Sequence, residues 1–135
     1  MSIGTAELEV RKGVWAKLNA DATLVTTLAC KIYQRVPEDA ALPYLSIWTG
    51  IADPMDTFGR IGRKLTMRLH IFSEKVDDDQ AYLIADRADE LLDYATDITA
   101  TGYTVISISL DDAQSFQQKE YVRVQMDYMV RVEEL

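Results

Sequence analysis

The residue pattern that most constrains the fold is a strict alternation of apolar and polar side chains near the end of the chain. It runs from Glu120 to Val132, and its apolar members are Val122, Val124, Met126, Tyr128, Val130 and Val132. Successive side chains of a β-strand point to opposite faces, so this pattern indicates a strand with one buried face. Lys64–Ser73 alternates in the same way, with Leu65, Met67, Leu69 and Ile71 on one face. Two such strands favour an antiparallel sheet that is covered on one face.

Three further segments are expected to be extended because they are rich in β-branched and aromatic residues. They are Lys31–Val36, Tyr44–Ala52 and Tyr103–Leu110. Prolines at both ends of the 37–43 segment exclude a helix across it. Asp53–Gly62 is expected to form the long tip of a hairpin, since Asp53 and Pro54 break the strand before it. Asp111–Lys119 is polar apart from Phe116 and is interpreted as a linker.

Helical periodicity occurs in three places. Thr5–Ala20 carries apolar residues at every fourth position, namely Ala6, Val10, Val14 and Leu18. Gly13 weakens this helix by about 1 kcal/mol relative to alanine, so tertiary packing must hold it. A short second helix is expected at Ala22–Leu28, with Asp21 as its N-cap. The third helix is expected from about Asp79 to Tyr94, capped by the acids of Asp77–Asp79.

These elements predict an α+β fold in the order α(α)-β-β-β-α-β-β, with an antiparallel sheet of about four strands and helices packed on one face. The 135 residues are expected to form a single domain, residues 1–135. The first segment mixes acids and bases and has no long apolar run, so neither a signal peptide nor a membrane span is expected. Cys30 is the only cysteine, which fits a reducing compartment such as the cytoplasm.

No group of residues matches a known catalytic or ligand-binding pattern, so we expect no enzymatic activity, no cofactor and no metal. The single histidine, His70, falls on the polar face of its strand and is interpreted as a surface residue. The segment 58–64 has glycines three apart and basic residues, but a strand follows it where a phosphate-binding loop needs a helix. Helix capping explains Asp77–Asp79, because adjacent aspartates converge poorly on one ion.

The net charge argues against nucleic acid and anionic membranes as partners. The sequence contains 22 acidic and 14 basic residues, a net charge of −8, which repels phosphates at long range. The charges are unevenly placed: residues 58–70 hold four basic residues and no acid, whereas residues 74–97 hold nine acids and two basic residues. Two interpretations stay open. The charged regions are either two solvated faces, or an interface in which the basic edge of one copy meets the acidic edge of the next.

The basic hairpin tip is predicted to be a contact surface because its glycine-flanked arginines and lysine have no acid among them. Together with the acidic linker it supplies the candidate residues of a protein–protein interface. These are Phe58, Arg60, Arg63, Lys64, Asp111, Asp112 and Phe116.

Three short patterns resemble those of a phage protein family. They are I-Y-x-x-V-P-x-x-A-x-L-P-Y at Ile32–Tyr44, T-x-x-x-H-I-F-S at Thr66–Ser73, and I-A-D at Ile84–Asp86. With the helix before them and the alternating strands after them, nearly the whole chain is similar to the tail-completion, or tail-terminator, proteins of long-tailed phages and gene-transfer particles.

That resemblance implies a structural role without catalysis. Members of the family form a ring, usually a hexamer, at the head-proximal end of the tail tube, where the ring ends polymerisation and joins the tail to the head. The implied partners are further copies of the chain, the tail-tube protein and the head–tail connector proteins. The implied place is the virion, after assembly in the host cytoplasm. A neck or head-completion adaptor and a minor tail subunit remain as alternatives, as does a small ligand-binding domain or enzyme.

Overall fold

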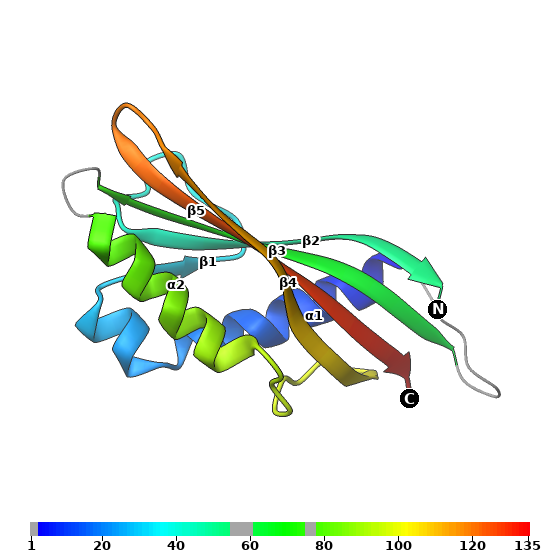
Figure 1. The fold of residues 1–135 in the computed structure, drawn as a ribbon. Helices are drawn as coiled ribbons and strands as arrows, with labels where there is room; N and C mark the ends of the chain where they lie inside the picture. The colour runs from blue at the N-terminus through cyan, green and yellow to red at the C-terminus, as the bar shows by residue number, and fades with distance from the viewer. Residues whose placement is uncertain (1–2, 55–60, 75–77) are drawn as a thin grey trace.

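A computed structural model describes residues 3–54, 61–74 and 78–135 of the chain. Two helices, one π-helical turn and five strands follow one another in the order shown in Figure 1. Their bounds are α1 Ile3–Asn19, η1 Thr23–Thr27, β1 Lys31–Tyr33, β2 Tyr44–Pro54, β3 Gly62–Glu74, α2 Asp78–Leu92, β4 Tyr103–Gln117 and β5 Tyr121–Glu134. The expected α+β class and the order of the elements are confirmed.

The sheet has five strands in the order β1-β2-β3-β5-β4. The pairs β2–β3, β3–β5 and β4–β5 are antiparallel, as expected. The short β1 adds a fifth strand, and it pairs with β2 in parallel, with Lys31 opposite Tyr44. The sheet is therefore mixed rather than wholly antiparallel. The loop with the two prolines carries the chain back to the end of the sheet where β1 began, so β2 runs in the same direction as β1.

The largest difference from the sequence-based expectation lies in β4. The segment predicted as a linker, Asp111–Lys119, instead continues the strand as far as Gln117, and only 118–120 form the turn to β5. Two register shifts, at Val105/Ser107 and Leu110/Asp112, interrupt the pairing with β5. Each shift moves the side chains to the opposite face. The alternation that marks a strand is thereby lost, although the backbone stays paired.

Smaller differences occur at the ends of elements. β2 includes Pro54, although Asp53 and Pro54 were expected to break it. α2 ends at Leu92, and Tyr94, with φ 58°, takes the left-handed conformation common just after a helix. The second helix is a π-helical turn whose N-cap is Ala22 rather than the predicted Asp21, although Asp21 Oδ2 accepts the Leu24 N–H at 3.0 Å. Asp77, part of the predicted cap of α2, lies outside the described residues.

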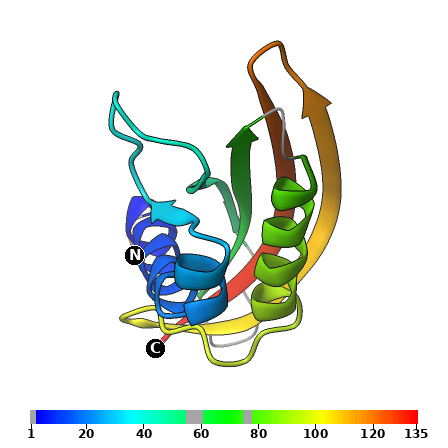
Figure 2. The same ribbon diagram turned by 90° about the vertical axis from the view of Figure 1, so that its left-hand side faces the viewer.

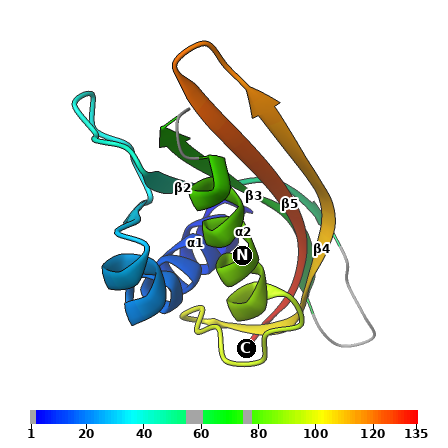
Figure 3. The same cartoon turned by 60° about the vertical axis from the view of Figure 1, so that its left-hand side comes forward.

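Both long helices cover the same face of the sheet, which curves around α2 (Figures 2 and 3). α1 packs chiefly against β2, and α2 packs chiefly against β3 and β5. The predicted apolar stripes form the core: Ala6, Val10, Val14 and Leu18 of α1 are fully buried, as are Leu65, Met67, Leu69 and Ile71 of β3. The opposite face of the sheet, called the outer face below, carries the polar and aromatic members of the same strands.

Candidate interaction surface

Those predicted interface residues that the structure describes do not all lie together. Phe58 and Arg60 lie outside the described residues, whereas Arg63 and Lys64 lie at the start of β3. Asp111, Asp112 and Phe116 belong to β4. Through β5, Lys64 shares a row across the sheet with Ser107, and Phe116 shares a row with Phe72. Eight residues along β3 separate these two rows, roughly 26 Å.

Two basic residues stand side by side at one end of the sheet. Lys64 of β3 lies opposite Arg131 of β5 on one side and opposite Asp53 of β2 on the other, and Arg131 is exposed. Like charges placed opposite each other across two strands are unfavourable. Arg131 was not among the predicted site residues, because only the register of β3 with β5 places it beside Lys64.

A second charged row crosses the middle of the outer face. Asp112 stands opposite Asp127, and Asp127 stands opposite Arg68. The Arg68 guanidinium binds both oxygens of Asp127, at 2.7 and 3.4 Å, and this pairing raises the pKa of Arg68. The same guanidinium lies 5.6 Å from the centre of the Trp48 ring, which is 45% exposed. A cation–π contact and an ion pair therefore hold the side chains of this row in place. Asp112 is the acid of the row that has no basic residue opposite it in the register.

An aromatic cluster fills the part of the outer face nearest the β4–β5 turn. The Phe72 ring stacks on Tyr44 with centroids 4.9 Å apart and lies 5.5 Å from Tyr121. His70 is part of this cluster rather than a freely exposed residue, with its ring centroid 6.2 Å from that of Phe72. Burial, and then the nearby Arg123 and Arg68, lower the pKa of His70. Tyr44, Phe72 and Tyr121 are far apart in the sequence, so no local pattern could group these three rings.

A groove of about 260 Å³ opens on the other side of the sheet, between α2 and the β4–β5 hairpin. We call it the α2–hairpin groove. It exists because α2 packs chiefly against β3 and β5, which leaves part of β4 uncovered. The residues that define it are Tyr82, Asp86 and Asp89 on α2, with Ala113, Val124 and Met126 on the hairpin. Its floor is apolar and its helix side is acidic.

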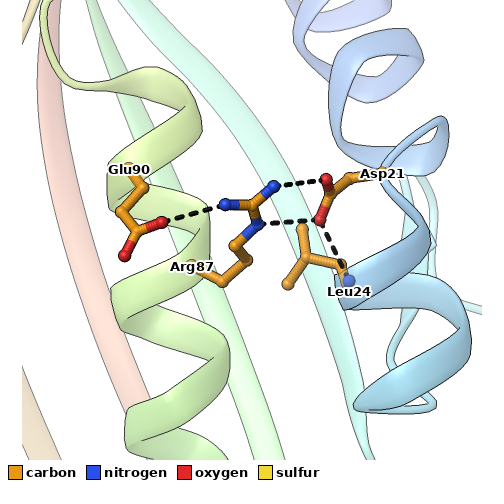
Figure 4. A network of polar contacts seen from close by, with 4 residues as sticks. All are labelled: Asp21, Leu24, Arg87 and Glu90. Carbon is orange, nitrogen blue, oxygen red and sulfur yellow. Dashed lines mark hydrogen bonds and ion pairs between the residues drawn. The ribbon is translucent and has the colours of Figure 1, made fainter.

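Polar contacts fix α2, and with it one wall of the groove. Arg87 donates to both oxygens of Asp21 at 2.7 and 3.0 Å, and to Glu90 at 2.9 Å (Figure 4). The hydrogen bonds from Arg87 lower the pKa of Asp21, opposed by burial and aided by the Leu24 N–H. Tyr128, fully buried on β5, donates its hydroxyl to Asp89 at 2.7 Å.

Within the described part of the chain, no three histidine, cysteine or acidic side chains gather as metal ligands would. Cys30 is fully buried, and burial raises the pKa of its thiol to about 12, which disfavours the reactive thiolate form. A wider hollow of about 720 Å³ beside α1 is lined in part by Lys17 and Asp97, which pair with each other. Among the described helices, none combines the length and apolar character needed to cross a bilayer.

Comparisons with known proteins agree with this fold. A chain from the virion of a native gene transfer agent (GTA) particle superposes with a TM-score of 0.78 and 20% identity, over 98% of both chains. A second solved structure aligns over 96% of both chains, with a TM-score of 0.51 and 20% identity. No curated protein sequence matches the chain significantly. The family described as "Tail completion protein gp17" matches residues 12–133. Since this match spans most of the sequence, the chain belongs to the tail completion protein gp17 family.

Proposed function

We propose that the protein is a structural component of a phage or gene-transfer particle, which closes as a ring of six copies on the head-proximal end of the tail tube. The ring ends tail polymerisation and presents a surface for joining the head. The observation that carries the proposal is the match to the tail completion family over residues 12–133. In this role the chain binds further copies of itself, the tail-tube protein and the head–tail connector, with no cofactor and no catalysis.

The distribution of charge supports a ring. A ring needs a head-to-tail contact, in which two different patches of one surface meet. The basic residues Lys64 and Arg131 and the acidic residues of α2 lie on separate parts of the molecule. A net charge of −8 also suits a particle through which DNA must pass, because basic residues lining the passage would hold phosphates.

The test is to remove the gene from the producing strain and to examine the particles by electron microscopy. We expect tails of uncontrolled length without heads, and we expect the wild-type gene supplied in trans to restore joined particles. A tagged copy should be seen at the head-proximal end of the tail. Tails of normal length that fail to join heads would instead support a neck adaptor, and fully normal particles would contradict both roles.

A further inference from the structure

We propose that the side of α2 that points away from the sheet packs, in the next copy, on the outer face of the sheet near the β4–β5 turn. The helix offers two acids that flank an exposed leucine, and the sheet offers two cations that flank a pair of aromatic rings. The proposal rests on the ring proposed above and names the two surfaces of its repeated contact.

One row of side chains crosses the outer face through all five strands, and we call it the aromatic row. Its members, in strand order, are Lys31, Tyr44, Phe72, Arg123 and Phe116. The row contains no acid, and neither does the adjacent row that contains His70. On its other side, Glu74 stands opposite Tyr121 rather than opposite a cation. Both long helices lie on the other face of the sheet, so they leave the aromatic row uncovered (Figures 2 and 3).

The two cations of the aromatic row have no acidic partner within the described chain. Lys31 is exposed, and the guanidinium carbon of Arg123 lies 4.3 Å from the centre of the Phe116 ring. Neither cation forms an ion pair with a described residue. Between them, the rings of Tyr44 and Phe72 stack with centroids 4.9 Å apart. A complementary partner brings acids for the two cations and an apolar group for the rings.

The side of α2 that points away from the sheet has that combination. Asp79, Leu83 and Asp86 share one face of the helix, because four and seven residues separate the last two from the first. We call these three residues the α2 stripe. Leu83 is 55% exposed. Both aspartates are exposed and, within residues 3–54, 61–74 and 78–135, form no ion pair, whereas Glu90 already accepts a hydrogen bond from Arg87.

The spacings of the two surfaces are compatible. Seven residues of a helix span about 10 Å, which separates Asp79 from Asp86 along α2. Lys31 and Arg123 are three strand spacings apart, about 14 Å. The flexible stem of Lys31 can lean toward the helix and shorten this span. Acid and cation can therefore pair at both ends while Leu83 contacts the rings.

The two surfaces lie on opposite layers of the molecule, which makes the contact head-to-tail. The α2 stripe belongs to the helix layer, and the aromatic row lies on the sheet face without helices (Figure 2). A rigid two-fold dimer cannot bury both, because each copy would have to turn two opposite sides to its partner. A contact between two different surfaces instead repeats from copy to copy, and it forms a ring when the rotation closes.

Photo-crosslinking tests the contact even when association is weak. Tyr44 is replaced by p-benzoylphenylalanine, which keeps an aromatic ring in the aromatic row, and the isolated protein is irradiated. We expect crosslinked dimers in which mass spectrometry finds the probe joined to the peptide that contains Leu83. The control carries the same probe at Leu8, which is 38% exposed on α1 and belongs to neither surface. It should give no crosslink to α2 of another copy.

Charge exchange tests whether the acids of the α2 stripe meet the cations of the aromatic row. In chains that carry the Tyr44 probe, a helix variant has Asp79→Lys with Asp86→Lys, and a sheet variant has Lys31→Glu with Arg123→Glu. Each alone should lower the yield of crosslinked dimer by about fivefold, the size expected when exposed ion pairs are reversed. A mixture of the two should restore the yield, because the helix of one variant then complements the row of the other.

Net charge alone cannot produce that recovery. Two reversals shift a net charge of −8 by four units, so both variants stay negative and repel each other at long range. Asp97→Lys with Asp111→Lys makes the same change of net charge as the helix variant, at exposed positions outside both surfaces. This control should not lower the yield.

Three results would overturn the proposal. The first is a Tyr44 probe that never reaches α2 of another copy, and the second is a mixture whose yield stays as low as that of the separate variants. The third is a probe that reacts only after tail tubes are added, and then with the tube protein. The mapped crosslink uses no charge variant, so it decides the proposal even if Arg123→Glu disturbs the fold. Overlong tails after gene deletion, without a crosslink to α2, would remove this contact and leave the proposed function standing.

Discussion

Gly13 is the residue at which α1 approaches the rest of the chain most closely. A Cβ at this position would lie 2.0 Å from the carbonyl oxygen of Thr99 and 3.2 Å from the side chain of Ile98. From the sequence alone, Gly13 is expected only to lower the stability of its helix. The structure shows that a loop distant in the sequence packs against the helix at this position, and no local pattern predicts that contact.

We therefore expect Gly13→Ala to destabilise the fold by about 1–3 kcal/mol, since the atom that it would meet is backbone and cannot rotate away. An unhindered helical glycine would behave oppositely and gain about 1 kcal/mol on the same change. Urea unfolding of the variant measures the difference, with Lys12→Ala at the exposed neighbouring position as the control. A stabilised Gly13→Ala protein would show that Thr99 does not pack there.

A second residue-scale prediction concerns the pair of Arg87 with Asp21. Because the pKa of Asp21 is lowered in the folded protein, the pair stabilises the fold above the unfolded pKa of about 4 and loses this effect as the pH falls through the lower folded pKa. Arg87→Gln should thus lower the thermal midpoint at pH 7, and the gap to wild type should close in acid. Lys17→Gln, which removes a pair to the largely exposed Asp97, should have a smaller effect. A gap that does not change with pH would contradict this assignment.

At the scale of elements, strands were predictable where one face is buried and the other solvated. β3 and β5 satisfy that condition along their whole length, and their alternation revealed them. β4 does not: it is an edge strand with two register shifts, and its second half is exposed on both faces. Polar residues such as Asp111 and Gln114 therefore resemble a loop in the sequence, although their backbone is paired.

The link between α2 and β4 gives a prediction at this scale. Asp93, at the end of α2, accepts the Leu110 N–H at 2.9 Å, immediately before the second register shift of β4. Asp93→Ala should cost about 1–2 kcal/mol, because it leaves a partly buried N–H without its acceptor. Asp93→Asn, which keeps an acceptor oxygen, should cost less. Asp86→Ala removes the same charge from an exposed position of the same helix and should change unfolding by less than about 0.5 kcal/mol. Equal effects of all three changes would contradict the role of Asp93.

At the scale of the whole molecule, the sequence predicted the fold class, the order of elements and the family. It also proposed Arg63 and Lys64 as interface residues because their spacing is local, and that role stays a prediction. The partnership of Lys64 with Arg131, and the groove between α2 and the hairpin, depend on register and on which strand a helix covers. Those are properties of long-range packing, and they become visible only in three dimensions.

Net charge leads to an expectation about DNA. With a net charge of −8, and with Arg68 already paired with Asp127, the free protein should not bind duplex DNA specifically. The measurement is a mobility shift at physiological salt with excess competitor DNA. A shifted band that survives the competitor would contradict it.

The same charge makes assembly depend on salt. The six copies of the proposed ring would carry −48 in total, so self-repulsion would oppose a free ring at low ionic strength. We expect a monomer or small oligomer in dilute solution, and light scattering across a salt series then separates two cases. If general repulsion dominates, added salt promotes association; if attraction between a basic and an acidic patch of adjacent copies dominates, added salt weakens association. A two-fold dimer that persists at every salt concentration would contradict the ring.

The register shifts of β4 have one more consequence, which concerns the time before assembly. β4 is an edge strand of fifteen residues. A straight, uncharged edge strand of this length could pair with strands of other molecules. Here the backbone bends twice, and Asp111 and Asp112 place two negative charges at the second bend. Bends and charges at an edge strand oppose such strand addition, so we expect free copies of this protein to resist stacking into fibrils.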